Sequence, residues 1–135
     1  MRCKVAFVCT GNACRSQIAE GWAKELGRDI WEVHSAGTHP TREVNPKAVT
    51  VMKEVDVDIS GQYPKNLEDI PSELDILITM GCGVNCPFVP NRHQEDWGIA
   101  DPVGKPLEEF RKVRDEIKQK VAELRNKYLK NESPL

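Results

Sequence analysis

The sequence predicts an α/β fold in which helices cover a mostly parallel β-sheet. Residues 5–8 and 75–80 form short, continuous apolar runs, which are typical of strands buried on both faces. Residues 16–27 and 106–128 place their apolar side chains at helical spacing. Strands that alternate with helices along a chain usually pair in parallel, because each helix carries the chain back across the sheet.

The first half of the chain begins with a strand, a loop, a helix and a second strand. The strand at 5–8 leads through a loop at 9–15 into a helix that begins near Ser16 and ends at Gly27. Side chains then alternate in character over 30–37, which predicts a second strand that ends at a glycine.

The second half of the chain adds further elements of both kinds. A second helix starts at 45–46, where asparagine is the N-cap and proline is the first helical residue. Residues 57–59 are expected to form a brief strand. The strand at 75–80 opens into a long loop over about 81–105, and a long helix follows from Pro106.

Length and charge limit the classes of protein that this chain can represent. A chain of 135 residues has the usual size of one domain, so we expect residues 1–135 to fold as a single domain. The 19 Lys and Arg residues nearly balance the 21 Asp and Glu residues, and the net charge is −2. This balance argues against partners such as nucleic acid or an anionic membrane, which require a net basic face.

The chain shows no signal for export or membrane insertion. No apolar run approaches the ~18 residues of a membrane span, and the N-terminus lacks the pattern of a signal peptide. We therefore expect a cytoplasmic protein. The five cysteines then indicate catalytic or buried thiols, because a reducing compartment disfavours permanent disulfides.

The loop between the first strand and the first helix carries the strongest functional signal. Gly11 and Asn12 tolerate a positive φ, and such a loop at a helix N-terminus turns backbone N–H groups towards an anion. Arg15 adds a planar, permanently charged group that can grip two oxygen atoms. The residues expected to surround a tetrahedral oxyanion are Thr10, Gly11, Asn12, Ala13, Cys14 and Arg15.

Cys9, at the start of this loop, is the predicted nucleophile. Backbone dipoles, the helix N-terminus and Arg15 all favour its thiolate form, and Ser16 could donate a hydrogen bond to the sulfur. The alternative is a buried thiol beside an ordinary tight turn. Cys14, inside the loop, and Cys3, at the start of the first strand, are expected to be structural.

The segment from Cys9 to Trp22, CTGNACRSQIAEGW, resembles the phosphate loop and first helix of the low-molecular-weight protein tyrosine phosphatase family. It is more similar to the thioredoxin-coupled arsenate reductases built on that fold, because Gln17 stands where the phosphatases usually carry proline. Further similar motifs lie at 35–37, 44–48, 58–60, 96–98, 101–102 and 110–117. The resemblance implies a three-layer sandwich with a four-stranded, mostly parallel sheet and helices on both faces.

The resemblance also implies an acid and a relay of thiols. Asp101, followed by proline, matches the family's general acid, which protonates the departing oxygen; a turn-forming Asp-Pro is the alternative. In the implied mechanism Cys9 attacks arsenate, Cys82 attacks Cys9 and releases arsenite, and Cys86 attacks Cys82. Thioredoxin or a similar thiol donor then reduces the resulting disulfide. The three residues between Cys82 and Cys86 make a shorter spacing than is usual in the family.

Metal binding is not expected. Cys82 and Cys86 could be inert loop thiols or half of a zinc site with His93, but a second ligand pair at metal spacing is absent from the sequence. Some relatives of the resembled family bind a monovalent cation near the loop through three positions and a further aspartate, and this chain has no acid at 63–66. The positions that match the three are Asn12, Glu20 and Ser35. We therefore expect neither a metal nor a cofactor.

The predicted function is the reduction of arsenate, with arsenate or phosphate as the bound oxyanion. The alternative is hydrolysis of phosphomonoesters through a phosphocysteine, since arsenate and phosphate share shape and charge. Asp101 is followed by Pro-Val-Gly rather than by the aromatic residues that often flank an aryl substrate, which disfavours efficient phosphatase activity. A non-enzymatic redox sensor or zinc-binding adaptor is a third possibility, of a different class.

Overall fold

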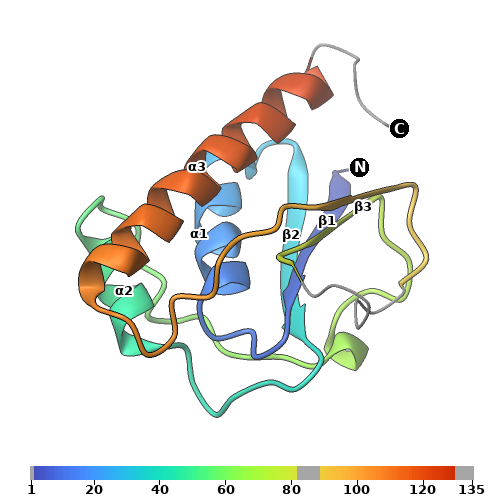
Figure 1. The fold of residues 1–135 in the computed structure, drawn as a ribbon. Coiled ribbons are helices and arrows are strands. Elements are labelled where there is room, and N and C mark those ends of the chain that lie inside the picture. Colours follow the sequence, from blue (N-terminus) through green and yellow to red (C-terminus); the bar gives the residue numbers. More distant parts are fainter. Residues whose placement is uncertain (1, 82–88, 130–135) are drawn as a thin grey trace.

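The computed structural model describes residues 2–81 and 89–129, and its sheet has four strands (Figure 1). The elements are β1 (Cys3–Cys9), α1 (Arg15–Gly27), β2 (Trp31–Gly37), α2 (Pro46–Lys53), the 3-10 helix η1 (Leu67–Asp69), β3 (Ile76–Thr79), β4 (His93–Asp96) and α3 (Leu107–Leu129). The strands lie in the order β2-β1-β3-β4, and each neighbouring pair is parallel. The predicted α/β fold with a four-stranded, mostly parallel sheet is confirmed.

The α-helices gather on one face of the sheet (Figure 1). Alternate residues of β1, Val5 and Phe7 among them, form one core with buried residues of the helices, such as Ile18 of α1 and Ile117 of α3. Phe7 also meets the ring of Trp97, with the ring centroids 5.7 Å apart. Burial of these apolar side chains is the main force that holds helices and sheet together.

A thinner layer covers the opposite face. The intervening residues of β1, Ala6 and Val8, form a second core with Leu77 of β3 and with Ile70. Leu67 of η1 packs against this second core. Helical structure therefore lies on both faces of the sheet, with α-helices on one and a 3-10 helix on the other, and the result is the expected three-layer sandwich.

Two details of the sheet differ from the prediction. Residues 57–59 form no strand, because Asp56 adopts a left-handed φ of 63° and the N–H of Val57 donates to the carbonyl of Met52. This stretch closes the end of α2 instead of pairing with the sheet. The fourth strand is β4, inside the stretch that was expected to be a loop. It is an edge strand with the polar sequence His-Gln-Glu-Asp, which carries no apolar signal.

The helix boundaries follow the local sequence. α1 ends at Gly27 as predicted, and a Cβ atom at this position would lie 2.3 Å from the ring of Trp31. The side chain of Asn45 caps α2 by accepting a backbone N–H, and Pro46 is the first helical residue. In residues 2–81 and 89–129, no helix has both the length and the apolar character that crossing a membrane requires.

The parallel arrangement brings the carboxyl ends of the strands to one edge of the sheet. Cys9, the last residue of β1, is in register with Gly37, the last residue of β2. Thr79, at the end of β3, pairs with Val8. The loops that leave these strands therefore meet at one edge, which is where open parallel sheets bind their ligands.

Candidate active site

Cys9 lies buried at the carboxyl end of β1, against the first turn of α1. Its Sγ is 2.9 Å from Oγ of Ser16. The Ser16 oxygen accepts a hydrogen bond from Nδ2 of Asn12 at 2.7 Å, so the hydroxyl proton of Ser16 is available to the sulfur. The geometry thus places Ser16 where it can donate to Cys9.

Asn12 holds the loop between β1 and α1 in shape. Its φ is 50°, a left-handed conformation that asparagine tolerates, and the residue is fully buried. Its Nδ2 also donates to Oγ of Ser35 at 3.1 Å, and its Oδ1 accepts the N–H of Lys65 at 2.9 Å. Its carbonyl accepts from Nε2 of Gln17 at 3.0 Å. Three separate segments therefore clamp this single loop residue.

The other carbonyls of the loop face residues 38–45. The donor and acceptor pairs are Thr38 to Cys9 (3.3 Å), His39 to Thr10 (2.8 Å), Thr41 to Gly11 (3.0 Å) and Asn45 to Ala13 (2.9 Å). In a trans peptide the C=O and the N–H of the next residue point in opposite directions. The N–H groups of residues 10, 11, 12 and 14 therefore point away from 38–45, as an anion-binding nest requires.

The end of β2 presses against the same loop. Gly37 pairs with Cys9, and its N–H donates to the carbonyl of Lys65 at 2.8 Å. A Cβ atom at position 37 would lie 2.6 Å from the carbonyl oxygen of Thr10 and 2.9 Å from the backbone nitrogen of Asn12. Only glycine allows the two backbones to approach this closely.

Arg15 is the first residue of α1 and lies at the carboxyl edge of the sheet. Its Nη1 donates to the carbonyl oxygens of Met80 (2.9 Å) and Ile99 (3.0 Å). Its Nη2 lies 3.8 Å from Oδ2 of Asp101. One guanidinium nitrogen therefore anchors the side chain, while the other lies beside a carboxylate.

Asp101 is the predicted acid, and the structure brings it to the loop. Its side chain is 52% exposed, and its Oδ1 accepts the N–H of Val103 at 3.1 Å. The same segment supplies the Ile99 carbonyl that anchors Arg15. Asp101 thus lies next to the guanidinium that would bind an oxyanion, open to exchange of protons with solvent.

Cys14 and Cys3 have the environment of structural thiols. Burial, together with the negative charge of Asp101, raises the pKa of the Cys14 thiol to about 12. Burial, together with the charge of Asp75, raises the pKa of Cys3 to about 12 as well. Both thiols are protonated at neutral pH and are weak nucleophiles in that form.

Cys82 and Cys86 lie outside the described residues, so the predicted relay is not placed. The residues just before them are described. The N–H of Met80 donates to the carbonyl of Val8 at 3.2 Å, and Gly81 has a φ of 104°, which turns the chain at the end of β3. The chain that leads to Cys82 therefore starts beside the anion loop.

Two of the three histidines, His34 and His93, pair with carboxylates on their own strands, and Nδ1 of His39 lies 3.3 Å from the hydroxyl oxygen of Thr38. Nε2 of His34 is 2.7 Å from Oε2 of Glu32, and Nε2 of His93 is 2.7 Å from Oε2 of Glu95. Within the part of the chain that the structure describes, no three His, Cys, Asp or Glu side chains gather as metal ligands. The zinc alternative also involves residues 82 and 86, and it falls outside that part.

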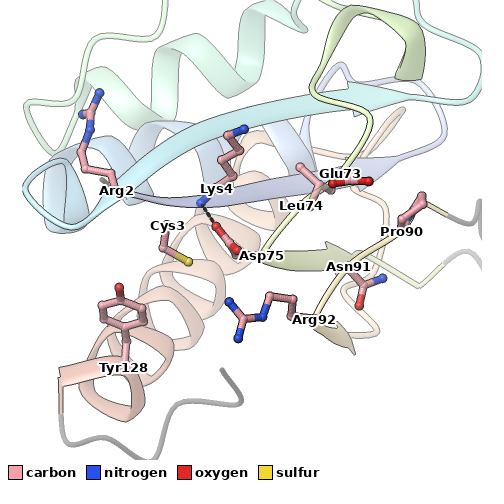
Figure 2. Close-up of a pocket in the computed structure, with 10 residues that line it drawn as sticks. All are labelled: Arg2, Cys3, Lys4, Glu73, Leu74, Asp75, Pro90, Asn91, Arg92 and Tyr128. Carbon is pink, nitrogen blue, oxygen red and sulfur yellow. Dashed lines mark hydrogen bonds between the residues drawn. The ribbon is translucent and has the colours of Figure 1, made fainter.

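A cavity of about 540 Å³ lies at the opposite edge of the sheet, and Figure 2 shows the side chains that line it. Its walls include Cys3, Asp75, Arg92 and Tyr128, and Asp75 accepts the backbone N–H of Lys4 at 2.7 Å. β1 begins beside this cavity and ends at the anion loop. The cavity therefore belongs to the amino ends of the strands and is separate from the candidate active site.

Lys65 and Gly37 support the loop, although sequence reasoning did not single them out as site residues. Lys65 donates its backbone N–H to Asn12, a contact that any residue except proline could make, so no sequence signal marks it. For Gly37 the sequence does contain a signal, because a glycine at the end of a strand often marks a close approach of two backbones.

Similar proteins share both the sequence and the fold. A family model described as low molecular weight phosphotyrosine protein phosphatase matches residues 4–134. Arsenate reductase of Staphylococcus aureus (strain Newman) is 49% identical over 118 residues, which cover 84% of this chain and 89% of that protein.

Two solved structures agree with these matches. A structure of an arsenate reductase in the phosphate binding state is 45% identical with a TM-score of 0.83, and the match covers 92% of this chain and 96% of that one. The thioredoxin-dependent arsenate reductase of Corynebacterium glutamicum is 32% identical with a TM-score of 0.76, and the match covers 93% of this chain and 61% of that one. Because the family model spans almost the whole chain, this protein belongs to the low molecular weight phosphotyrosine protein phosphatase family.

Proposed function

We propose that this protein is an arsenate reductase that uses Cys9, Cys82 and Cys86 and that a thioredoxin-type donor regenerates. One observation carries the proposal: Arg15 of the anion loop donates to the carbonyl of Met80, so the chain that continues to Cys82 starts beside the nucleophile. A phosphatase needs one cysteine, whereas reduction needs a second thiol within reach of the first. Similarity to arsenate reductases, one of them thioredoxin-dependent, supports the same function.

Arsenate would bind in the cup above Cys9. The N–H groups of residues 10, 11, 12 and 14 and the guanidinium of Arg15 hold its oxygens. The Cys9 thiolate attacks arsenic and forms a sulfur–arsenic bond, while Asp101 protonates the hydroxyl that leaves as water. Asp101 is positioned for this role because its Oδ2 lies 3.8 Å from Nη2 of Arg15, the group that would hold the oxyanion.

Two thiol exchanges would complete the reduction. The Cys82 thiolate attacks the sulfur of Cys9, and the electron pair of the sulfur–arsenic bond stays on arsenic, which leaves as arsenite. Cys86 then attacks Cys82, which releases Cys9 as a thiolate and forms the Cys82–Cys86 disulfide. A thioredoxin-type dithiol reduces this disulfide and becomes oxidised in turn. Each arsenate therefore takes two electrons from the donor.

We expect this chemistry to take place in the cytoplasm, because thiol donors keep cysteines reduced there. The proposed reaction requires an oxyanion and a thiol donor, and none of its steps needs nucleic acid, a membrane or a cofactor. Residues 1–135 would act as one domain, because the relay joins the loop after β1 to the loop after β3.

Hydrolysis of phosphomonoesters is the second candidate. The family match and the pairing of Arg15 with Asp101 favour it, since the same cup and the same acid serve a phosphocysteine. Val103 is exposed near Asp101 where an aromatic residue would flank an aryl group, so we propose only weak activity on aryl phosphates.

A coupled assay with arsenate, thioredoxin, thioredoxin reductase and NADPH tests the proposal. Cys82→Ser should abolish reduction and leave hydrolysis of an aryl phosphate unchanged, whereas Cys9→Ser should abolish both. Cys3→Ala is the matched control, and it should retain turnover because Cys3 lies at the other end of β1. Sustained reduction of arsenate by Cys82→Ser or Cys86→Ser would rule the relay out.

A further inference from the structure

Glu20 is a buried carboxylate on α1. Its side chain is 6% exposed, and a buried charge is costly unless it is paired and hydrogen-bonded. The ammonium group of Lys24 lies 2.6 Å from Oε2, and that of Lys65 lies 3.5 Å from Oε1. The hydroxyl of Ser35 also donates to Oε1. Of the two lysines, Lys65 is the more enclosed, with 14% of its side chain exposed against 41% for Lys24.

A line of hydrogen bonds runs from this carboxylate to the nucleophile. Because the hydroxyl of Ser35 donates to Glu20, its oxygen is free to accept from Nδ2 of Asn12 at 3.1 Å. The same amide donates to Ser16 at 2.7 Å, and Ser16 lies 2.9 Å from the sulfur of Cys9. The charge on Glu20 therefore orients the Ser35 hydroxyl, and the amide of Asn12 links that hydroxyl to Ser16 and the sulfur.

Lys65 contacts this hydrogen-bonded network through both its backbone and its side chain. Its backbone N–H donates to Oδ1 of Asn12 at 2.9 Å. Its ammonium group donates to the carbonyl of Tyr63 at 2.8 Å and lies 4.7 Å from the centre of the Tyr63 ring. The positive charge is thus surrounded by a carboxylate oxygen, a carbonyl oxygen and an aromatic face, as a bound cation would be.

A monovalent cation does not fit beside these residues. The resemblance implies such an ion in some relatives at positions that match Asn12, Glu20 and Ser35. In this chain the Lys65 ammonium lies against the same Glu20 oxygen that accepts from Ser35, and two like charges this close repel each other. We propose that the ammonium group of Lys65 supplies the charge that such a cation would supply, and that Lys65 thereby positions the anion loop without one.

The site could accept a cation once that ammonium group is gone. A cavity of about 380 Å³ opens onto Glu20, Lys24 and Lys65, and two further carboxylates, Asp58 and Asp69, line it. Solvent ions therefore have a path to Glu20. Lys24 pairs with Oε2 of Glu20, so loss of the Lys65 ammonium group leaves Oε1 without its lysine partner. A small cation such as K⁺ carries the same charge as the ammonium group and binds oxygen ligands, so it should replace the missing charge.

The test compares two salts and two kinds of substitution. Lys65→Met removes the charge and keeps the apolar stem, whereas Lys65→Arg keeps the charge. Lys112→Met is the matched control, because Lys112 is 66% exposed and its salt bridge among the described residues is with Glu109 on the same helix. Affinity for inorganic phosphate and the thermal midpoint are measured for each protein in potassium chloride and in choline chloride at equal ionic strength.

The wild type and Lys112→Met should give the same phosphate affinity in both salts, within twofold. Lys65→Met should bind phosphate about fivefold to tenfold more weakly in choline, the lower part of the range for coupled sites. Its thermal midpoint should also fall by at least about 5 °C, since one partner of a buried pair is gone. Potassium should restore most of both losses, and Lys65→Arg should resemble the wild type.

Two results would overturn the inference. One is a wild type that binds phosphate at least fivefold more tightly in potassium than in choline; the other is a Lys65→Met protein that matches the wild type in choline. If Lys65→Met fails to fold in both salts, Lys65→Gln takes its place in the same measurements, and the comparison of the wild type in the two salts still tests the inference. The inference rests on the proposed oxyanion loop. If that loop bound no phosphate, the thermal midpoints in the two salts would still test whether the Lys65 ammonium group takes the place of a cation.

Discussion

Gly37→Ala introduces one methyl group where two backbones meet. The new Cβ would lie 2.6 Å from the carbonyl oxygen of Thr10, 2.9 Å from the backbone nitrogen of Asn12 and 3.0 Å from its Cβ. None of these atoms is the end of a flexible side chain, so no rotamer change relieves the contact. Either the end of β2 or the anion loop must move.

The size of the effect follows from these distances. Ordinary contacts begin near 3.4 Å, so the loop must shift by several tenths of an ångström or more. Overpacking of this kind costs about 1–3 kcal/mol, which lowers the thermal midpoint of a domain of this size by roughly 3–10 °C. A displacement of ~1 Å in a catalytic site costs about 100-fold in rate, so kcat/KM for arsenate should fall at least tenfold.

Gly61→Ala is the matched control, because a Cβ at position 61 meets no atom within 4 Å. The two variants are compared in the coupled arsenate assay, in phosphate binding and in thermal unfolding. If Gly37→Ala retains kcat/KM and phosphate affinity within twofold of Gly61→Ala, the close approach of β2 does not shape the loop, and the reasoning from these contacts is refuted.

Two further predictions follow from the described site. At pH 8 iodoacetamide should leave Cys3 and Cys14 of the folded protein unmodified, because burial raises the pKa of each thiol to about 12 and only the thiolate reacts. Peptide mass spectrometry before and after unfolding checks this prediction. Labelling of either thiol in the folded state would contradict it. Asp101→Asn should lower kcat by about 100-fold or more, because the substitution removes the acid. Phosphate binding should be retained or strengthened, because a negative charge 3.8 Å from Nη2 of Arg15 is gone. Weaker phosphate binding would contradict this prediction and show that Asp101 holds Arg15 in place.

The contiguous part of the site could be predicted from local sequence. A buried strand, a loop with Gly11 and Asn12, and a helix that begins at Arg15 follow one another along the chain, and each is marked by its own local sequence pattern. Cys9 and Arg15 lie in this stretch, so their proximity needed no tertiary information.

The sheet shows where such reasoning stops. β4 was missed because an edge strand need not be apolar, and its residues, His93 to Asp96, alternate between partly buried and exposed. The expected strand at 57–59 was wrong, since apolar residues after a helix can also bury themselves against the helices without joining the sheet. Val57 and Ile59 belong to the helical core in just this way.

By itself, the sequence determined the strand–loop–helix unit and the places of Cys9 and Arg15 within it, because periodicity and turn-forming residues mark each of these elements locally. Only the tertiary structure decided that Asp101 meets Arg15, that Gly37 closes on the loop, and that Lys65 pairs with Glu20. These contacts join segments far apart in sequence. Their distances are set by the register of the parallel strands and the packing of the whole core, which no local pattern encodes.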